Sequence, residues 1–341
     1  MSWAETLKNH PEANFLQSPS WAKMNELIGA EVITEEFEKG GRAQLIVCNA
    51  KRGRYLEVPC GPLIDWSDKE LVDKVFTRIK EVAKEKRCVF VRIRPQLEGT
   101  PENLKLLKDL GLRPSLMHLA AEHTVLIDLT KSEEDLLTEM RRQTRYEVKR
   151  AEKQGIILEK SNSEKIFREF HTVQTETAKR KGFIPPSLEV LLAERKALGD
   201  NAKIYIATTQ EKAPVAYGLI ITCGKEADYY EAASTELNYR LSGAYALIWQ
   251  VIKDMKAAGY ERLNLWGIAP ANQPHHRYAG VTTFKTGFGG VKYEFVPAHD
   301  LVISKIKYIK NYIVETARHT KRHLEKGKHA NYFRRKSKAM G

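Results

Sequence analysis

The sequence predicts an α+β protein of two similar domains in tandem, each a mixed sheet flanked by helices. Three observations lead to this prediction. The chain has 341 residues, which is more than one hydrophobic core usually serves. Short strand-like runs separated by turn signals alternate with amphipathic helical segments, a pattern typical of α+β folds. A similar order of elements occurs once in each half, which indicates one unit used twice.

The first half is expected to begin with a run of strands. A Gly61-Pro62 turn separates the third strand from an amphipathic helix. The expected elements are strands at 31–37, 43–49 and 55–58, a helix at 69–84, a strand at 88–93, a helix at 102–110 and a strand at 123–129.

A single helix over residues 132–155 is expected to join the two halves. Ser132 followed by Glu-Glu-Asp is an N-cap signature, and Gly155 is a suitable C-terminal stop. At 3.6 residues per turn, Arg142, Arg145 and Lys149 share one face, which makes a basic stripe able to follow phosphates. Charged helix faces are usually only solvated surfaces, so the stripe indicates a nucleic acid only in combination with other features.

The second half repeats the pattern with two helices in front. The expected elements are helices at 164–181 and 188–198, strands at 203–208, 215–222 and 228–233, a helix at 243–258, a strand at 262–265, a short helix and a strand at 291–296.

These elements divide the chain into two domains and a tail. The first domain is expected to comprise residues 1–141 plus about 298–325, the second residues 142–297, and residues 326–341 a basic flexible tail. A last helix at about 301–324 is expected to pack back on the first domain. The residues expected to pack are Ile303, Ile306, Ile309 and Ile313.

Composition excludes several classes of protein. No apolar run approaches the roughly 20 residues that a membrane span needs. The first residues lack the pattern of a secretory signal, and the four cysteines have neither metal-site nor disulfide-scaffold spacing. We therefore expect a cytoplasmic protein without a metal, and peripheral contact with the inner face of the membrane stays open.

The positive charge is concentrated at one end of the chain. The formal net charge is +13, and residues 318–341 contain nine Lys or Arg against one acid. Clustered cations attract a phosphate polymer or an anionic membrane surface. A solvated, partly disordered end is an equally good interpretation.

The segment 266–290 is the first place to expect chemistry. It reads as a strand end, a Gly/Pro loop, a short helix ending in Phe284 and Lys285, and a Gly-rich turn. A lysine among this many glycines favours a reactive site on a loop. The alternative is that Phe284 is a core aromatic and Lys285 its exposed neighbour.

The order of elements in each half resembles the GNAT acyltransferase fold. In members that use coenzyme A, the helix after the central strand opens with a Gly-rich motif whose N–H groups hold a pyrophosphate. The corresponding stretch runs from Arg240 to Tyr245, and the bulky Tyr245 replaces the last small residue. This change disfavours acetyl-CoA as the donor.

Five motifs in order resemble the FemABX family of tRNA-dependent, peptidoglycan bridge-forming aminoacyltransferases, in the compact form without a coiled-coil arm. They are Phe15-Leu-Gln-Ser-Pro-Ser-Trp21-Ala-Lys23, Gly61-Pro-Leu63, the basic segment from Met140 to Arg150, the stretch from Arg240 to Tyr245, and Trp266-Gly-Ile268 with Phe284-Lys285. Together they extend over nearly the full chain.

The resemblance implies transfer of an amino acid from aminoacyl-tRNA to a free amine on the stem peptide of a peptidoglycan precursor. Such a protein needs no cofactor, because aminoacyl-tRNA is the co-substrate, and no stable protein partner is implied. Lys285 would stabilise the developing negative charge or hold the tRNA acceptor end, and Phe284 would stack or shape the pocket. Arg142, Arg145 and Lys149 would contact tRNA phosphates.

The remaining candidates concern the acceptor. Lys23 is expected near the diphosphate of the precursor, with Trp21 packing beside it. Tyr230 is expected to face the cleft. The substrate-binding candidates are Lys23, Trp21, Arg94, Tyr230, Arg240 and Tyr245.

The sequence departs from the family pattern at three places. Compact members can carry an acidic residue where this chain has Arg94, and a cation cannot be a general base, although it can hold a phosphate or carboxylate. Asn25 and Pro185-Pro186 stand where cations would grip a diphosphate. A lipid-linked precursor is therefore at least as good a candidate as one linked to uridine diphosphate.

Three other functions stay open. A CoA-dependent N-acyltransferase is disfavoured by Tyr245. A transferase that modifies protein N-termini from charged tRNA differs only in its acceptor. A non-catalytic RNA-binding protein would use the basic joining helix and the tail.

Overall fold

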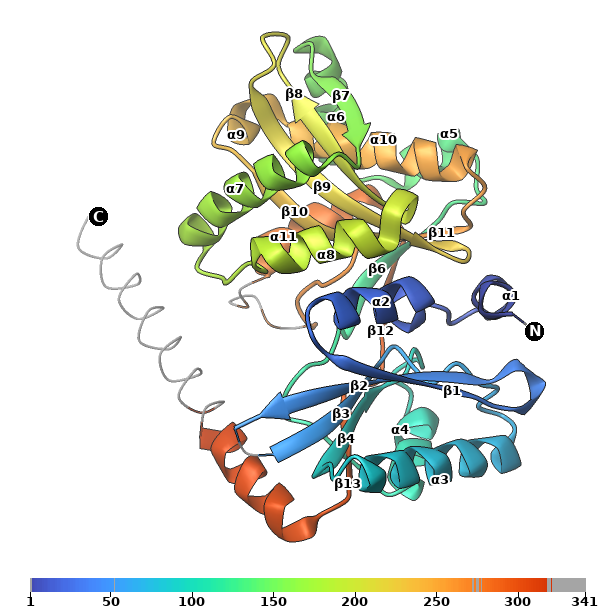
Figure 1. The fold of residues 1–341 in the computed structure, drawn as a ribbon. Helices are drawn as coiled ribbons and strands as arrows, with labels where there is room; N and C mark the ends of the chain where they lie inside the picture. Colours follow the sequence, from blue (N-terminus) through green and yellow to red (C-terminus); the bar gives the residue numbers. More distant parts are fainter. Residues whose placement is uncertain are drawn as a thin grey trace, which may run out of the picture.

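Two mixed β-sheets lie one above the other, each flanked by helices (Figure 1). The computed structural model describes residues 2–51, 53–271, 273, 276, 278–317 and 320. The basic tail predicted at 326–341 lies outside the described residues. The prediction of an α+β protein with two mixed sheets, each flanked by helices, is confirmed.

The first sheet has the strand order β1-β2-β3-β4-β13-β5. Its strands are β1 (Glu31–Glu36), β2 (Arg42–Ala50), β3 (Gly53–Pro59), β4 (Phe90–Arg94), β5 (Leu112–Pro114) and β13 (His299–Val302). Helices α3 (Lys69–Glu85) and α4 (Pro101–Asp109) contribute to the core on one face of this sheet. The pairing of β3 with β4 is parallel because α3 carries the chain back across that face.

The second sheet has the strand order β12-β6-β11-β10-β9-β8-β7. Its strands are β6 (His123–Asp128), β7 (Ile157–Ser161), β8 (Ala202–Thr208), β9 (Pro214–Cys223), β10 (Glu226–Ser234), β11 (Arg262–Asn264) and β12 (Val291–Glu294). Helix α10 (Gly243–Ala257) packs on β8 and β9. Helices α7 (Glu164–Lys181) and α8 (Leu188–Leu198) pack together on the sheet, with α7 against β10.

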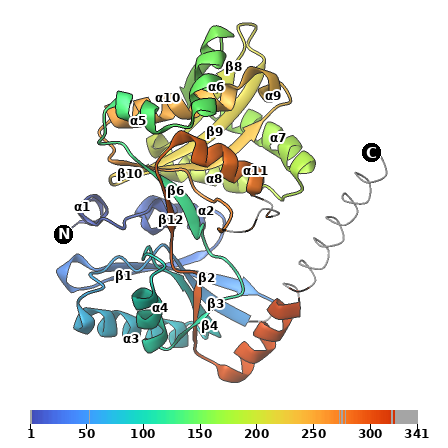
Figure 2. The same cartoon turned by 180° about the vertical axis from the view of Figure 1, so that it is seen from behind.

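Each sheet contains a strand from outside its own half of the chain. Strand β6, within the range 1–141 assigned to the first domain, pairs with β11 and β12 of the second sheet. Figure 2 shows β6 and β12 running together toward the junction of the domains. Strand β13 returns after the second domain and pairs with β4 and β5. The exact domain boundaries stay a prediction.

The N-terminal segment forms much of the junction. The 3₁₀-helix η1 (Phe15–Gln17) and helix α2 (Pro19–Leu27) carry Phe15 and Trp21 into a hydrophobic cluster with α7, α8 and β9. Helix α2 packs directly on α8. The remaining short helices are α1 (Trp3–Asn9), η2 (Glu38–Gly40), η3 (Gly199–Asn201), α9 (Asn238–Leu241), α11 (Ala279–Lys285) and η4 (Thr286–Phe288).

The prediction of one joining helix is wrong. The structure has two helices, α5 (Glu133–Glu139) and α6 (Arg142–Lys153), because Met140 and Arg141 are extended, with ψ of 144° and 140°. The Arg141 N–H donates to the Gly287 carbonyl oxygen at 2.9 Å, so a long-range contact replaces helix continuation.

The predicted packing of the last helix is also wrong in part. The helical segment begins at residue 305 rather than 301, because 299–302 form β13. Ile303 does pack against the hydrophobic core between the first sheet and α3. The buried residues of the helix are instead Tyr308, Asn311 and Glu315. Ile306, Ile309 and Ile313 are exposed.

Two kinds of site are absent from the described residues. None of their helices is long and apolar enough to cross a membrane. Nor do they contain three or more His, Cys, Asp or Glu side chains grouped to hold a metal ion.

Candidate active site

The face of the first sheet toward the second domain is polar. Alternation along β3 and β4 places Glu57, Arg92 and Arg94 on the face opposite the apolar core. Arg92 forms two hydrogen bonds with Asp300, at 2.8 and 2.9 Å, and one with Glu315 at 3.1 Å. Arg92 is thus covered by the last helical segment, whereas its neighbour Glu57 on β3 lines the junction with the second domain.

A pocket of about 210 Å³ lies at the junction of the two domains. Its lining comes from η1, α2, β2, β3, β10 and the loops before β6 and after β11. The lining residues are Leu16, Trp21, Asn25, Ile46, Glu57, Pro59, Leu119, Ala120, Tyr230 and Trp266. The pocket brings together two of the predicted substrate-binding residues, Trp21 and Tyr230.

Aromatic rings fix the shape of this interdomain pocket. The Phe15 ring lies edge-on to Trp21 and to Tyr230, with centroids 5.1 and 5.0 Å apart. The rings of Tyr230 and Trp266 meet edge to face at 5.4 Å. Burial raises the pKa of Tyr230 well above its usual value, so its hydroxyl stays protonated.

Glu57 supplies a carboxylate to the pocket. The Tyr55 hydroxyl donates to Glu57 Oε1 at 3.1 Å. Burial raises the pKa of Glu57, while Tyr55 and the charge of Arg92 act in the opposite direction. A half-buried carboxylate with a raised pKa is a stronger base than an ordinary glutamate and is suited to accept a proton.

Sequence reasoning missed Glu57. Alternation along β3 could have placed it opposite the core, but nothing in the sequence shows that this face is covered by a second domain. Its register partner on β4 is Arg92, and this charged pair points to a covered polar face only once the pairing of β3 with β4 is known.

Lys285 is buried at the end of α11. Its side chain is 8% exposed, and Nζ donates to the Gly267 carbonyl oxygen at 3.0 Å. Nζ also lies 5.8 Å from the centre of the Tyr229 ring. Burial lowers the pKa of Lys285 to about 7. Because Gly267 follows Trp266, the amine lies one residue along the backbone from the wall of the interdomain pocket.

Phe284 and Tyr245 belong to one aromatic group. Their ring centroids are 4.9 Å apart in an edge-on arrangement, and Phe288 lies 5.3 Å from Phe284 and 5.8 Å from Tyr245. Phe284 and Tyr245 are partly buried against the core of the second domain. This group holds the segment that carries Lys285.

The basic helix α6 packs against the same segment. Gly287 faces it so closely that an added Cβ would lie 2.3 Å from the Thr144 hydroxyl oxygen. The Arg141 guanidinium donates to the Thr283 carbonyl oxygen. Helix α6 and the segment that ends in Lys285 are therefore packed directly together.

The three residues of the predicted basic stripe lie in different surroundings. Arg142 and Lys149 are exposed. Arg145 instead donates to carbonyl oxygens at the end of α5, at 3.0 Å for Thr138 and 3.3 Å for Leu137, and also to Met140. Arg145 thus caps α5, and its predicted tRNA contact stays a prediction along with those of Arg142 and Lys149.

The start of α10 already holds a carboxylate. The Ser242 hydroxyl donates to Glu147 Oε2 at 2.5 Å, and the Ala244 N–H donates to Asn238 Oδ1 at 2.8 Å. An added Cβ on Gly243 would lie 2.6 Å from a Val215 methyl, so this glycine serves packing. An anion approaching this helix start would meet a negative charge and a donor already engaged.

Three other candidates lie outside the interdomain pocket. Lys23 and Arg240 have exposed side chains. Arg94 is 1% exposed, donates to Gln96 Oε1 at 2.7 Å and contacts Cys60 Sγ at 2.6 Å. Their substrate roles stay predictions.

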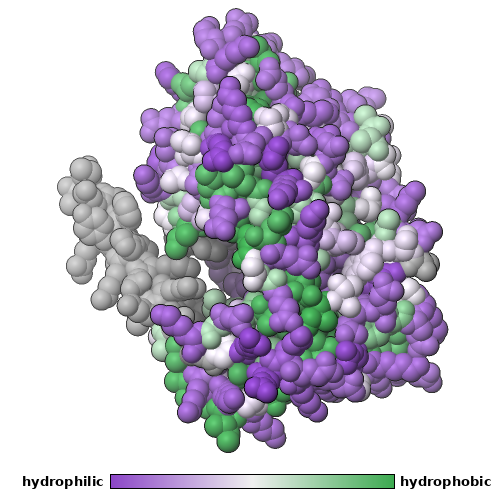
Figure 3. All heavy atoms as spheres, in the orientation of Figure 1, coloured by the Kyte–Doolittle hydropathy of each residue, from purple (hydrophilic) through white to green (hydrophobic). Residues whose placement is uncertain are grey.

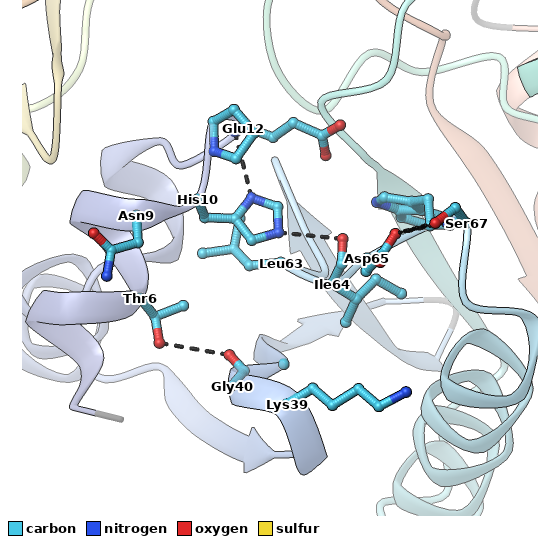
Figure 4. Close-up of a pocket in the computed structure, with 13 residues that line it drawn as sticks. Thr6, Asn9, His10, Glu12, Lys39, Gly40, Leu63, Ile64, Asp65 and Ser67 are labelled. Atoms are coloured by element: carbon cyan, nitrogen blue, oxygen red, sulfur yellow. Dashed lines mark hydrogen bonds between the residues drawn. The ribbon is translucent and has the colours of Figure 1, made fainter.

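A larger cavity of about 460 Å³ lies beside α1 and the loop after β3 (Figure 4). His10 is held there by the Ile64 carbonyl oxygen at 3.2 Å, and Glu12, Asp65 and Ser67 also line it. None of the predicted site residues lines this cavity. The smaller interdomain pocket is therefore the candidate active site.

Comparisons with known proteins agree with this architecture. The FemAB family model matches residues 3–106, 111–210 and 187–316. Lipid II:glycine glycyltransferase of Staphylococcus aureus is 26% identical over 227 residues, which cover 62% of this chain and 54% of that protein. The chain therefore matches about half the length of this curated relative.

Solved structures show the same fold. The crystal structure of FemX superposes with a TM-score of 0.82 at 17% identity, covering 92% of this chain and 97% of that one. L-PGS from Bacillus licheniformis superposes with a TM-score of 0.57 at 17% identity, covering 86% and 90%. The family resemblance recognised in the sequence is thereby confirmed: the chain belongs to the FemAB family.

Proposed function

We propose that this protein is an aminoacyltransferase that moves an amino acid from aminoacyl-tRNA to a free amine on the stem peptide of a peptidoglycan precursor. The observation that carries the proposal is the interdomain pocket, with the Glu57 carboxylate on one wall and the buried Lys285 amine behind another. Family membership and the glycyltransferase relative support the same reaction class.

The chemistry needs little from the protein besides alignment and charge. The acceptor amine attacks the ester carbon of the aminoacyl-tRNA, an amide bond forms, and the ester C–O bond to the tRNA ribose breaks. The nitrogen loses one proton, and the leaving ribose oxygen gains one. Glu57 accepts the proton from nitrogen. Lys285, in its charged form, stabilises the negative charge on the carbonyl oxygen.

The exposed cations of α6 fit the donor. Arg142 and Lys149 lie on the helix that contacts the Phe284-Lys285 segment, so phosphates bound to α6 would bring an acceptor end toward Lys285. Phe284 and Tyr245, which are partly buried, offer ring edges against which a terminal base could pack.

Use of coenzyme A is a weaker alternative. The carboxylate of Glu147, a residue of α6, contacts Ser242 at the start of α10, where a pyrophosphate would need backbone donors free of negative charge. Tyr245 crowds the same turn, as the sequence indicates. Thermal-shift titration with acetyl-CoA checks this, and we expect no change in melting temperature.

The acceptor we favour is the lipid-linked precursor. Asn25, which stands where a diphosphate-gripping lysine was expected, uses its amide to donate to the Trp21 carbonyl oxygen at 2.9 Å. It is 8% exposed and is thus committed to α2. The S. aureus relative is by name a lipid II glycyltransferase, which supports the same choice.

The proposal is tested with the purified full-length protein and a panel of charged tRNAs. Each is incubated with a lipid-linked and a nucleotide-linked muropeptide, and a peptide with a free N-terminus serves as the third acceptor. Mass spectrometry should show a muropeptide heavier by one aminoacyl residue. Transfer only to the free peptide would identify an N-terminal protein transferase instead, and no transfer from any tRNA would overturn the proposal.

A further inference from the structure

The helical segment 305–317 presents an unusually apolar outer face. Ile306 is 75% exposed, Ile309 58%, Ile313 61% and Tyr312 42%. Large aliphatic side chains rarely gather on one exposed helix face without a partner. Figure 3 shows this hydrophobic patch at the lower left edge of the molecule, where Figure 1 draws the segment.

Spacing places the three isoleucines on one side of the helix. They recur at intervals of three and four residues, which is one face at 3.6 residues per turn. The opposite side is buried and polar. Tyr308 donates to Asp300 Oδ2 at 3.1 Å, and Glu315 accepts from Arg92 at 3.1 Å.

These inner contacts fix the direction of the outer face. Tyr308 also packs on Phe90, with ring centroids 5.6 Å apart. Rotating the helix to bury the isoleucines would break the buried contacts with Asp300 and Arg92, which lie on β13 and β4. The apolar face is therefore held toward solvent by the first domain itself.

Positive charge surrounds the apolar face. Lys305, Lys307 and Lys310 are exposed on the same segment, whereas its one acid, Glu315, is buried against Arg92. An apolar face bordered by lysines, with no exposed acid, is complementary to a bilayer that carries anionic headgroups. An acidic protein groove would match the charge but would not need three isoleucines on one exposed helix face.

We propose that residues 305–317 dock the protein on an anionic phospholipid bilayer, with Ile306, Ile309 and Ile313 inserted at the level of the headgroups and the three lysines at the phosphates. This inference rests on the proposed function in one respect: docking brings the protein to a lipid-linked acceptor. The binding itself requires no catalysis.

The docking face is close to the interdomain pocket. Arg92, on β4, holds the helix through Glu315. Its register partner on the adjacent strand β3 is Glu57, which lines the pocket. When this helix lies on the membrane, Glu57 is one strand away from Arg92, the residue that holds the helix. We expect a lipid-linked substrate to approach the Glu57 wall of the pocket from the membrane side.

Vesicle co-sedimentation of the full-length protein tests the proposal. The probes are vesicles of phosphatidylcholine alone and of phosphatidylcholine with phosphatidylglycerol. The variant I306S/I309S/I313S removes the apolar face and leaves the basic tail in place, and V291S removes a similarly exposed aliphatic side chain, 66% exposed on β12, as a matched control.

We expect the wild-type protein and V291S to bind the anionic vesicles and the triple variant to bind at least tenfold more weakly, with an unchanged melting temperature. Equal binding by the triple variant would assign membrane affinity to the tail and overturn the proposal. So would a wild-type dimer that the triple variant converts to a monomer without loss of vesicle binding, since the face would then be a self-interface.

Activity separates this inference from the proposed function. The triple variant should lose transfer to a lipid-linked acceptor in vesicles and keep transfer to a nucleotide-linked muropeptide in solution. Vesicle binding without transfer to any acceptor would leave the docking surface standing and reject the aminoacyltransferase. Transfer with no binding of the wild-type protein to vesicles would do the reverse.

Discussion

The side chain of Lys285 reaches from the end of α11 to the carbonyl oxygen of Gly267, 3.0 Å from Nζ. This contact joins the start of the loop after β11 to the last residue of α11. It also places a buried amine next to Trp266, a residue of the interdomain pocket.

Replacing Lys285 with methionine should separate activity from stability. Loss of a charge that stabilises the transition state should lower kcat by about 100-fold or more. Removing a buried amine whose pKa is about 7 should raise the free energy of unfolding at pH 7 by about 2 kcal/mol, after allowance for the lost hydrogen bond. Lys292→Met, on the exposed part of β12, should change neither quantity. Transfer kinetics and urea unfolding measure both, and full activity in K285M would remove Lys285 from the mechanism.

The pH dependence of the reaction should report the same lysine. The charged form is present below its pKa of about 7, so kcat should fall as the pH rises through 7. Stability should move the opposite way. The unfolded chain binds this proton more tightly than the folded one, so the free energy of unfolding should rise between about pH 7 and the ordinary lysine pKa of about 10.4. K285M should lack this rise, and a wild-type kcat that increases above pH 7 would indicate a neutral lysine acting as a base.

Glu57→Gln should remove the proton acceptor without changing the size of the side chain. We expect kcat to fall by about 100-fold and KM to change little. Because burial raises the pKa of Glu57, the wild-type rate should decline as the pH falls through that raised pKa, and E57Q should lose this acid limb. Glu159→Gln on the exposed edge strand β7 is the control. A pH profile in E57Q with the acid limb intact would contradict the assignment.

Cations of α6 should differ in what they do. Arg142→Ala and Lys149→Ala should each raise KM for charged tRNA several-fold and lower the slope of log affinity against log salt by about 1. Arg145→Ala should lower the melting temperature, since Arg145 caps α5. Filter binding across a salt series and thermal unfolding distinguish the two effects. A salt slope unaltered by R142A and K149A would place the tRNA elsewhere.

Arg92→Met should unfold or loosen the first domain. It leaves Asp300 and Glu315 buried without their cation, which costs about 3–5 kcal/mol. Arg113→Met on the exposed part of β5 should cost almost nothing. Urea unfolding gives the difference, and a cost below about 1 kcal/mol in R92M would show that water reaches these carboxylates.

Strongly periodic elements were predictable from the sequence. The sequence predicts a helix at 164–181, and α7 has these bounds in the structure, where Ser163 caps its start and Gly182 ends it in the left-handed conformation. The break between α5 and α6 was not predictable, because its cause is a hydrogen bond from Arg141 to Gly287, far along the chain.

The error on the last helix has an electrostatic origin. Isoleucines at helical spacing predict a buried face, and nothing local contradicts this. The structure buries Tyr308 and Glu315 instead, because Arg92 and Asp300 already lie beneath them. The candidate site shows the same dependence on distant residues. Lys285 is predictable from its loop and its family motif, whereas the surroundings of Glu57 are formed only when the two domains meet.

Strand β13 also constrains how the protein is made. It lies between β4 and the edge strand β5, so one internal position of the first sheet stays vacant until residues 299–302 leave the ribosome. Domains usually fold in order of synthesis. Here the order is reversed. The second sheet is complete once β12 has been made, whereas the first sheet still lacks β13. The amino-terminal domain is thus the later one to finish folding, and shortening the chain to before β13 would damage the part made first.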